Sequence, residues 1–270
     1  MSVSHEKYLT YSGYLQLDEL LSLQRERSGV DGGEPEHDEM LFIIIHQVYE
    51  LWFKQLLHEL DYAVRLLDAD DPRPVLHTMK RVLTILKVLV AQIDILETMT
   101  PLDFLAFRTR LAEASGLQSF QFRELEFLLG ARRPEVFDRY PEGSEARAAI
   151  ERRFYDPTLW DAFIRFLHRA GFEMPTAALE RDVTRPIEAS AEVQAALIRV
   201  YREDPGLVAM CERLVDLDEG MQEWRYRHVK MVERTIGAKP GTGGTSGAGY
   251  LHRSLNQPLF PDLWAIRTAL

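Results

Sequence analysis

The stretch Asp38-Glu-Met-Leu-Phe-Ile-Ile-Ile-His-Gln-Val-Tyr-Glu-Leu-Trp52 decides the fold of this chain. Its apolar residues, and those that follow as far as Leu60, recur at spacings of three and four, as in an amphipathic helix. Asp38 is a good N-cap, and a turn around Asp70–Pro74 interrupts the pattern. The sequence therefore predicts one long helix from Asp38 to about Asp68, which needs equally long partners to cover its apolar side.

Two such partners are visible farther along the chain. A second apolar stripe runs from Val75 to Leu96 and stops near Thr98–Thr100, and a third begins at Pro205 and reaches about Ile236. Shorter helices are expected at Pro101 to about Ala114, Ser119–Leu129, 146–154, 158–171 and 191–203. Because no run alternates convincingly between polar and apolar residues, we expect an all-α helical bundle spanning 39–270, preceded by an arm at 1–38.

The charge balance excludes some partners. Formal net charge is −10 and the pI is about 5.4, so a nucleic-acid backbone would be repelled unless a strong basic patch existed. The pairs Arg132–Arg133 and Arg152–Arg153 are short and lie among acids, and we expect them to be solvated helix ends. The sequence thus argues against nucleic-acid binding.

The expected compartment is the cytoplasm. The first ten residues are polar, unlike a secretory signal, and no apolar run approaches the roughly 20 residues of a membrane span. Cys211, the one cysteine, excludes an internal disulfide and a cysteine-rich metal site, and it is expected to be a small buried side chain.

Two histidines stand inside strongly apolar helices. His46 follows Phe42-Ile-Ile-Ile, and His228 lies in Trp224-Arg-Tyr-Arg-His-Val-Lys-Met-Val. An imidazole among apolar groups is costly unless its nitrogens find partners, so each alone is best explained as a hydrogen-bonded core histidine. If the two helices face each other, a metal or haem site becomes an equal alternative, since neutral imidazole is a natural axial ligand of haem iron.

Two further features have both a structural and a functional explanation. The segment 237–249 contains six glycines and is either a surface loop or a loop that closes over a ligand, with hydroxyls from Thr242 and Thr245. Arg108 is expected to share a helical face with Phe104 and Leu111, where it either extends to water or binds an anion.

Taken together, six segments resemble the tryptophan 2,3-dioxygenase family, and the resemblance covers nearly the whole chain. They are Leu9-Thr-Tyr-Ser-Gly-Tyr-Leu-Gln-Leu-Asp-Glu-Leu-Leu21, Asp38–Lys54, Leu96-Glu-Thr-Met-Thr-Pro-Leu-Asp-Phe104, Ala114-Ser-Gly-Leu-Gln-Ser-Phe-Gln-Phe-Arg123, Trp224–Arg234 and Gly241-Thr-Gly-Gly-Thr-Ser-Gly247. The region 130–190 resembles the family least. Ile45, beside His46, replaces polar residues of some relatives and would alter the polarity there.

The resemblance implies an activity and a cofactor. The family opens the indole C2–C3 bond of L-tryptophan with O2 to give N-formyl-L-kynurenine, the first step of the kynurenine pathway. It uses haem b, ferrous in the active form, in an all-helical homotetramer that is a dimer of dimers.

The resemblance also implies a role for each matching residue. His228 would be the proximal iron ligand and His46 the distal catalytic histidine that accepts from the indole N–H. Arg108 would pair with the substrate carboxylate, and Thr242 would contact the same end of the substrate. Phe42, Phe104 and Leu111 would form the walls around the indole. Ser115 and Gly116 would lie near the haem. Tyr11, Tyr14 and Leu15 would reach in from a neighbouring subunit.

Three other functions are compatible with a helical scaffold of this kind. One is a haem mono-oxygenase that inserts a single oxygen atom into a substituted indole. Another is a haem- or O2-binding protein without turnover, which would not need Arg108, Thr242 or a closing loop. The third is a helical protein without haem.

Overall fold

The computed structural model describes residues 9–270 except 31, 243–246, 253–254 and 256, and the described part is helical with no strand. The all-α prediction is therefore confirmed. The α-helices are α1 (Tyr11–Leu15), α2 (Leu17–Leu20), α3 (His37–Asp68), α4 (Pro72–Leu96), α5 (Pro101–Arg108), α6 (Phe120–Leu128), α7 (Glu145–Tyr155), α8 (Leu159–Arg169), α9 (Thr176–Leu179), α10 (Ala191–Glu203), α11 (Pro205–Ile236), α12 (Ala248–His252) and α13 (Pro261–Ala265). Short 3₁₀ turns are η1 (Thr109–Leu111), η2 (Gly116–Gln118), η3 (Pro134–Arg139) and η4 (Ile266–Thr268).

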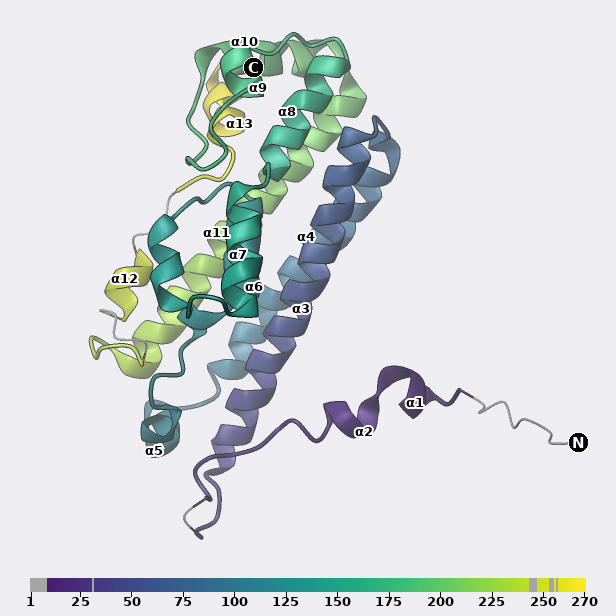
Figure 1. The fold of residues 1–270 in the computed structure, drawn as a ribbon. Coiled ribbons are helices and arrows are strands. Elements are labelled where there is room, and N and C mark those ends of the chain that lie inside the picture. Colours follow the sequence, from purple (N-terminus) through teal and green to yellow (C-terminus); the bar gives the residue numbers. More distant parts are fainter. Residues whose placement is uncertain (1–8, 31, 243–246, 253–254, 256) are drawn as a thin grey trace, which may run out of the picture.

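Three long helices, α3, α4 and α11, lie side by side and form the centre of the molecule (Figure 1). Their apolar sides meet in one continuous core that includes Leu60, Val82 and Leu214. The hydroxyl of Tyr49 on α3 donates to the carbonyl of Leu89 on α4 at 2.7 Å, which ties the two antiparallel helices together in mid-length. The predicted central bundle is confirmed.

Helix α3 begins one residue earlier than predicted. His37 is its first residue and Glu36 its N-cap, so Asp38 is not the cap but a first-turn acid. A carboxylate there still favours the helix because it faces the positive end of the helix dipole. The neighbouring Glu39 is buried and accepts from the backbone N–H groups of Arg27 and Ser28, both at 2.9 Å, which fastens the preceding segment to the helix.

Helix α5 is shorter than the sequence indicates. A capping box of Thr100 and Asp103 begins it, but it ends at Arg108 and tightens into η1, after which Ala112 adopts φ +49°. The predicted helix to about Ala114 is therefore wrong. In a 3₁₀ turn the residues i and i+3 are eclipsed, so the change of helix type shifts Leu111 from the position that a continuous α-helix would give it.

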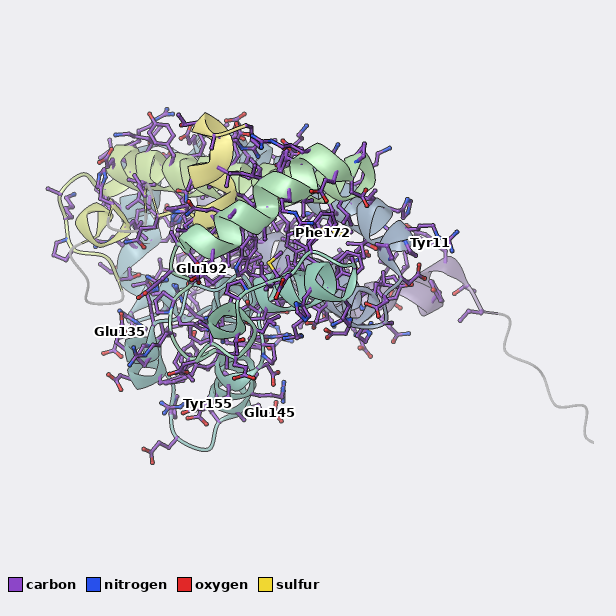
Figure 2. The ribbon with its side chains drawn as sticks, turned by 90° about the horizontal axis from the view of Figure 1, so that it is seen from above. Tyr11, Glu135, Glu145, Tyr155, Phe172 and Glu192 are labelled. Atoms are coloured by element: carbon purple, nitrogen blue, oxygen red, sulfur yellow. The ribbon has the colours of Figure 1, made fainter. Side chains whose placement is uncertain are left out.

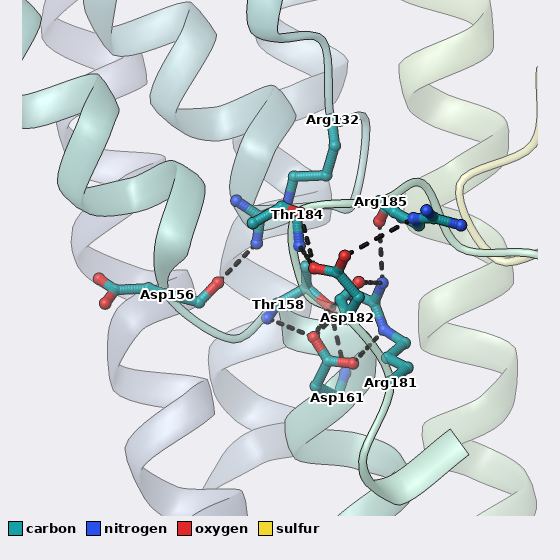
Figure 3. Close-up of polar contacts among 8 residues, drawn as sticks. All are labelled: Arg132, Asp156, Thr158, Asp161, Arg181, Asp182, Thr184 and Arg185. Atoms are coloured by element: carbon teal, nitrogen blue, oxygen red, sulfur yellow. Dashed lines mark hydrogen bonds and ion pairs between the residues drawn. The ribbon is translucent and has the colours of Figure 1, made fainter. Parts of the chain in front are cut away.

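The arginine pairs are mostly not solvated helix ends, contrary to expectation. Arg132 is buried and donates to the carbonyls of Arg153, Phe154 and Asp156 at 2.6–2.7 Å, which caps the end of α7. Figure 3 shows the bond to Asp156. Arg153 donates to both carboxylate oxygens of Asp61 on α3, at 2.7 and 2.9 Å. In the pair Arg152–Arg153, only Arg152 is exposed as expected. The expectation of solvated arginines was wrong because Arg132 and Arg153 find their acceptors, three carbonyls and one carboxylate, in segments that are distant in the sequence.

The arm projects away from the bundle. Figure 1 shows α1 and α2 extending to one side, and Figure 2 shows Tyr11 at the far end of that extension. Tyr11 and Tyr14 are 76% and 71% exposed, so no part of the described chain covers these aromatic rings.

Two other expectations concern Cys211 and membrane-spanning helices. Cys211 is buried in α11, as predicted. Every helix in the described ranges is either too short or too polar to cross a bilayer.

Candidate active site

One cavity of about 270 Å³ lies where α3, α5, α6 and α11 meet, and Gly241, Thr242, Gly247 and Leu251 border it. Apolar side chains such as Phe53, Ile93 and Val232 provide much of its lining. Eight of the residues singled out from the sequence line this one cavity: Phe42, His46, Phe104, Arg108, Ser115, Gly116, His228 and Thr242. Side chains from four separated segments therefore converge, which is how helical bundles build ligand sites.

His46 is held in one tautomer and one orientation. Its Nδ1 lies 2.6 Å from the carbonyl oxygen of Phe42, one turn earlier on α3. Because a carbonyl only accepts, Nδ1 carries the proton and Nε2 is left as an acceptor. Burial lowers the pKa of His46, which keeps the ring neutral. The site therefore presents a fixed neutral acceptor beside the ring of Phe42, whose centroid is 4.2 Å away.

His228 is also neutral, for similar reasons. Burial, and then the proximity of His46 and Arg123, lowers its pKa to about 4. The ring stacks on Trp224, one turn earlier on α11, with centroids 5.2 Å apart and planes 5° apart. Among the described residues it makes no hydrogen bond. A deprotonated imidazole nitrogen with no partner among the described residues, on the wall of an apolar cavity, is a donor well suited to haem iron.

Arg108 connects α5 to the glycine-rich segment. Its Nη2 donates to the carbonyl of Pro240, which precedes the cavity-lining residues Gly241 and Thr242. Phe104, one turn earlier, is buried against Phe42 with ring centroids 5.7 Å apart. The site thus has an apolar wall and, at one edge, a guanidinium next to a half-buried hydroxyl. Thr245, the other hydroxyl predicted for this loop, lies outside the described residues.

A buried ionic cluster at another side of the cavity was not expected. Glu126 on α6 is paired with Arg123, with Arg133 at 2.6 Å and with Arg225 of α11 at 3.6 Å. Burial alone would raise the pKa of Glu126, but the three guanidiniums hold it below its ordinary value. The three-residue spacing of Arg123 and Glu126 was visible in the sequence, whereas the other two partners come from distant segments.

Four predicted site residues are not at the cavity. Leu111 is partly buried against the main core but does not line the cavity. Tyr11, Tyr14 and Leu15 are in the exposed arm and do not line it either. Their expected role concerns a neighbouring subunit, which a single chain does not test.

Comparison with known proteins agrees with this geometry. The family model described as tryptophan 2,3-dioxygenase matches residues 2–151 and 152–270. Proteins with that name from Herpetosiphon aurantiacus and Anaeromyxobacter sp. are 56% and 54% identical over 262 and 267 residues, which is 97% and 99% of this chain and 98% of each relative. One from Caulobacter vibrioides is 45% identical over 265 residues, 97% of this chain and 98% of the relative. The chain therefore belongs to the tryptophan 2,3-dioxygenase family.

Proposed function

We propose that this chain is a haem-dependent dioxygenase that converts L-tryptophan and O2 into N-formyl-L-kynurenine. One observation carries the proposal: two neutral histidines from different long helices line a single apolar cavity that has a guanidinium at its edge. The role of each residue follows from the chemistry of its side chain.

The haem belongs on His228. In the described part of the chain, no group of three or more His, Cys, Asp or Glu lies together in a way that could hold a bare metal ion. An iron bound by His228 therefore needs its other ligands from a porphyrin, which the apolar cavity suits. Ferrous haem b supplies the activation of O2, and the protein supplies binding and orientation. Ser115 and Gly116, which line the cavity after α5, lie on the cofactor side in this proposal.

Arg108 and Thr242 bind the amino-acid end of the substrate. A guanidinium and a carboxylate form two parallel hydrogen bonds, which fixes both the position and the rotation of the ligand. Arg108 already bonds the backbone of the loop that carries Thr242, so the carboxylate would be received between α5 and that loop. The reacting ring is thereby brought to one place, which lowers the entropic barrier to reaction.

His46 orients the indole. Its Nε2 is the acceptor left by the bond from Nδ1 to Phe42, and an indole N–H is a donor only. Since that N–H is a very weak acid, His46 acts by hydrogen bonding rather than as an obligatory base. Phe42 and Phe104 form the apolar wall against which the ring packs, with Leu111 behind them, and together they exclude water.

We propose that the active form is a homotetramer in which the arm, 1–38, reaches a neighbouring subunit. Tyr11, Tyr14 and Leu15 are exposed and would complete that subunit's cavity. The helical domain, 39–270, also exposes apolar side chains on α3 and α4, where Leu51 and Val88 are 52% and 39% exposed. A charged substitution at Leu51 should lower the mass measured by light scattering, and an unchanged mass would contradict this assembly.

The activity is tested by incubating the haem-loaded protein with L-tryptophan, a reductant and isotopically labelled O2. The dioxygenase predicts a product heavier by two labelled oxygen atoms. A single labelled atom would identify a mono-oxygenase, and absence of product from a red, oxygen-binding protein would identify a carrier. Either result would overturn the proposal.

A further inference from the structure

The two imidazoles that line the cavity are oriented by different means. A hydrogen bond to the Phe42 carbonyl holds His46, whereas His228 makes none with the described residues and instead lies parallel to the indole of Trp224. The torsion that turns an imidazole about its Cβ–Cγ bond is broad, so packing must select its angle. At 5.2 Å between centroids and 5° between planes, the stack with Trp224 is the contact that selects it.

Trp224 is itself held by a cluster of aromatic rings from other helices. Phe122 of α6 lies 5.0 Å away at 43°, and Tyr49 and Phe53 of α3 lie 6.3 and 6.4 Å away at 68° and 84°. The hydroxyl of Tyr49 is in turn fixed by its bond to the backbone of Leu89. The indole therefore cannot rotate without displacing rings on two other helices.

The polar atom of Trp224 does not explain its presence. Its Nε1 is buried and forms no hydrogen bond of normal geometry in the part of the chain that the structure describes, and the Tyr49 hydroxyl is the polar group near it. Leaving a buried N–H unpaired costs free energy, and a local cost of this kind is common where a residue serves a site. Trp224 instead contacts His228 through the flat face of its indole ring.

We propose that Trp224 is a positioning residue that sets the plane of the His228 imidazole, and hence its angle to the haem. This inference rests on the proposed function, in which His228 binds the iron. Groups that surround a metal ligand commonly fix its ring orientation by a hydrogen bond. Here an aromatic face takes that role. Without the Trp224 ring, the imidazole of His228 should adopt a different angle or a wider range of angles, while its bond to iron can still form.

The test compares Trp224→Met, which fills similar space without a ring, with Trp224→Phe, which restores a ring without the N–H. The control is Trp52→Met, because Trp52 is a core tryptophan whose Nε1 is also buried and unpartnered among the described residues, but it does not line the cavity. Each haem-loaded protein is converted to the ferric cyanide complex. The proton NMR shifts of the haem methyl groups then report the plane of the axial imidazole. Haem transfer to apomyoglobin gives the rate of haem loss.

Trp224→Met should change the order of the haem methyl shifts and speed haem loss roughly fivefold, as expected for one lost aromatic pair. Trp224→Phe and Trp52→Met should keep the wild-type order. An unchanged order in Trp224→Met, or an order in Trp224→Phe that departs from wild type, would overturn the inference. If Trp224→Met does not fold, Trp224→Leu, which also lacks a ring, takes its place with the same expected outcomes. Failure of the wild-type protein to take up haem would instead refute the proposed function.

Discussion

Arg108 at the end of α5 donates a hydrogen bond to the carbonyl of Pro240, 132 residues later in the chain. The residue proposed to receive the substrate carboxylate therefore also holds the start of the glycine-rich segment. A carboxylate that binds the same guanidinium is a stronger acceptor than a backbone carbonyl, because charge-assisted hydrogen bonds are about twice as strong as neutral ones. Substrate binding and the position of Thr242 are thus expected to be linked.

Arg108→Ala should raise the KM for L-tryptophan far more than it lowers haem content. Arg108 is partly exposed, and bound substrate would bury its ion pair with the carboxylate; removing one partner of such a pair costs on the order of 2–5 kcal/mol in binding. Steady-state kinetics and the haem absorbance of the same preparations provide the measurement. Arg110→Ala, which removes an exposed arginine two residues later, is the matched control. An unchanged KM in Arg108→Ala would show that the carboxylate binds elsewhere.

His46→Ala should retain haem and lose about three- to tenfold in kcat/KM, the value of one neutral hydrogen bond. The modest size follows from its role as an acceptor that orients the indole, and the exposed His58 provides a control in His58→Ala. Complete loss of turnover with haem still bound would mean that His46 moves a proton and does more than orient.

Glu126→Gln should destabilise the fold by about 3 kcal/mol at pH 7, because it leaves buried guanidiniums with one fewer negative partner. Urea unfolding measures this, with the exposed ion pair of Glu203 as control in Glu203→Gln. The pKa of Glu126 is lowered in the folded state from the ordinary 4.5. Its contribution is therefore complete above pH 4.5 and is lost as the pH falls through the folded pKa. A difference between wild type and variant that persists undiminished in acid would contradict this account.

Gly247→Ala should disturb the loop more than Gly237→Ala. Both glycines have positive φ, +60° and +59°, so alanine is strained at either position. Only at Gly247 would the added Cβ also meet the backbone, 2.7 Å from the carbonyl oxygen of Lys239, whereas Gly237 has open space. Because Gly247 lines the cavity, its variant should show the higher KM. Equal kinetics in the two variants would separate this segment from the active site.

The long helices were predictable because their evidence is local. The apolar spacings that predict α3, α4 and α11 arise from the same periodicity that forms the core, and capping residues such as Thr158 and Ser190 lie immediately before the helices they begin. Within 130–190, the helices expected at 146–154 and 158–171 are present as α7 and α8, but the burial of Arg132 was not predictable because it depends on contacts between distant segments. Arg132 is buried only because three carbonyls around the end of α7 accept from it.

The candidate site was predictable in its residues but not in its geometry. An imidazole within an apolar helix is conspicuous, so His46 and His228 could be singled out, and the family resemblance assigned their roles. Spacing along the chain did not show that Arg108 would bond Pro240, or that Trp224 would lie parallel to His228. Nor did it show the end of α5, because a one-turn change from α to 3₁₀ leaves no clear mark in composition.

The central claim is that His228 holds an iron porphyrin whose open side faces bound tryptophan. The most direct test is the absorbance spectrum of wild type and His228→Ala after haem loading and removal of free haem, with His58→Ala as control. The account predicts a strong Soret band in wild type and the control that shifts when L-tryptophan is added, and loss of that band in His228→Ala. A wild-type protein that stays colourless, or a His228→Ala protein with the wild-type spectrum, would contradict it.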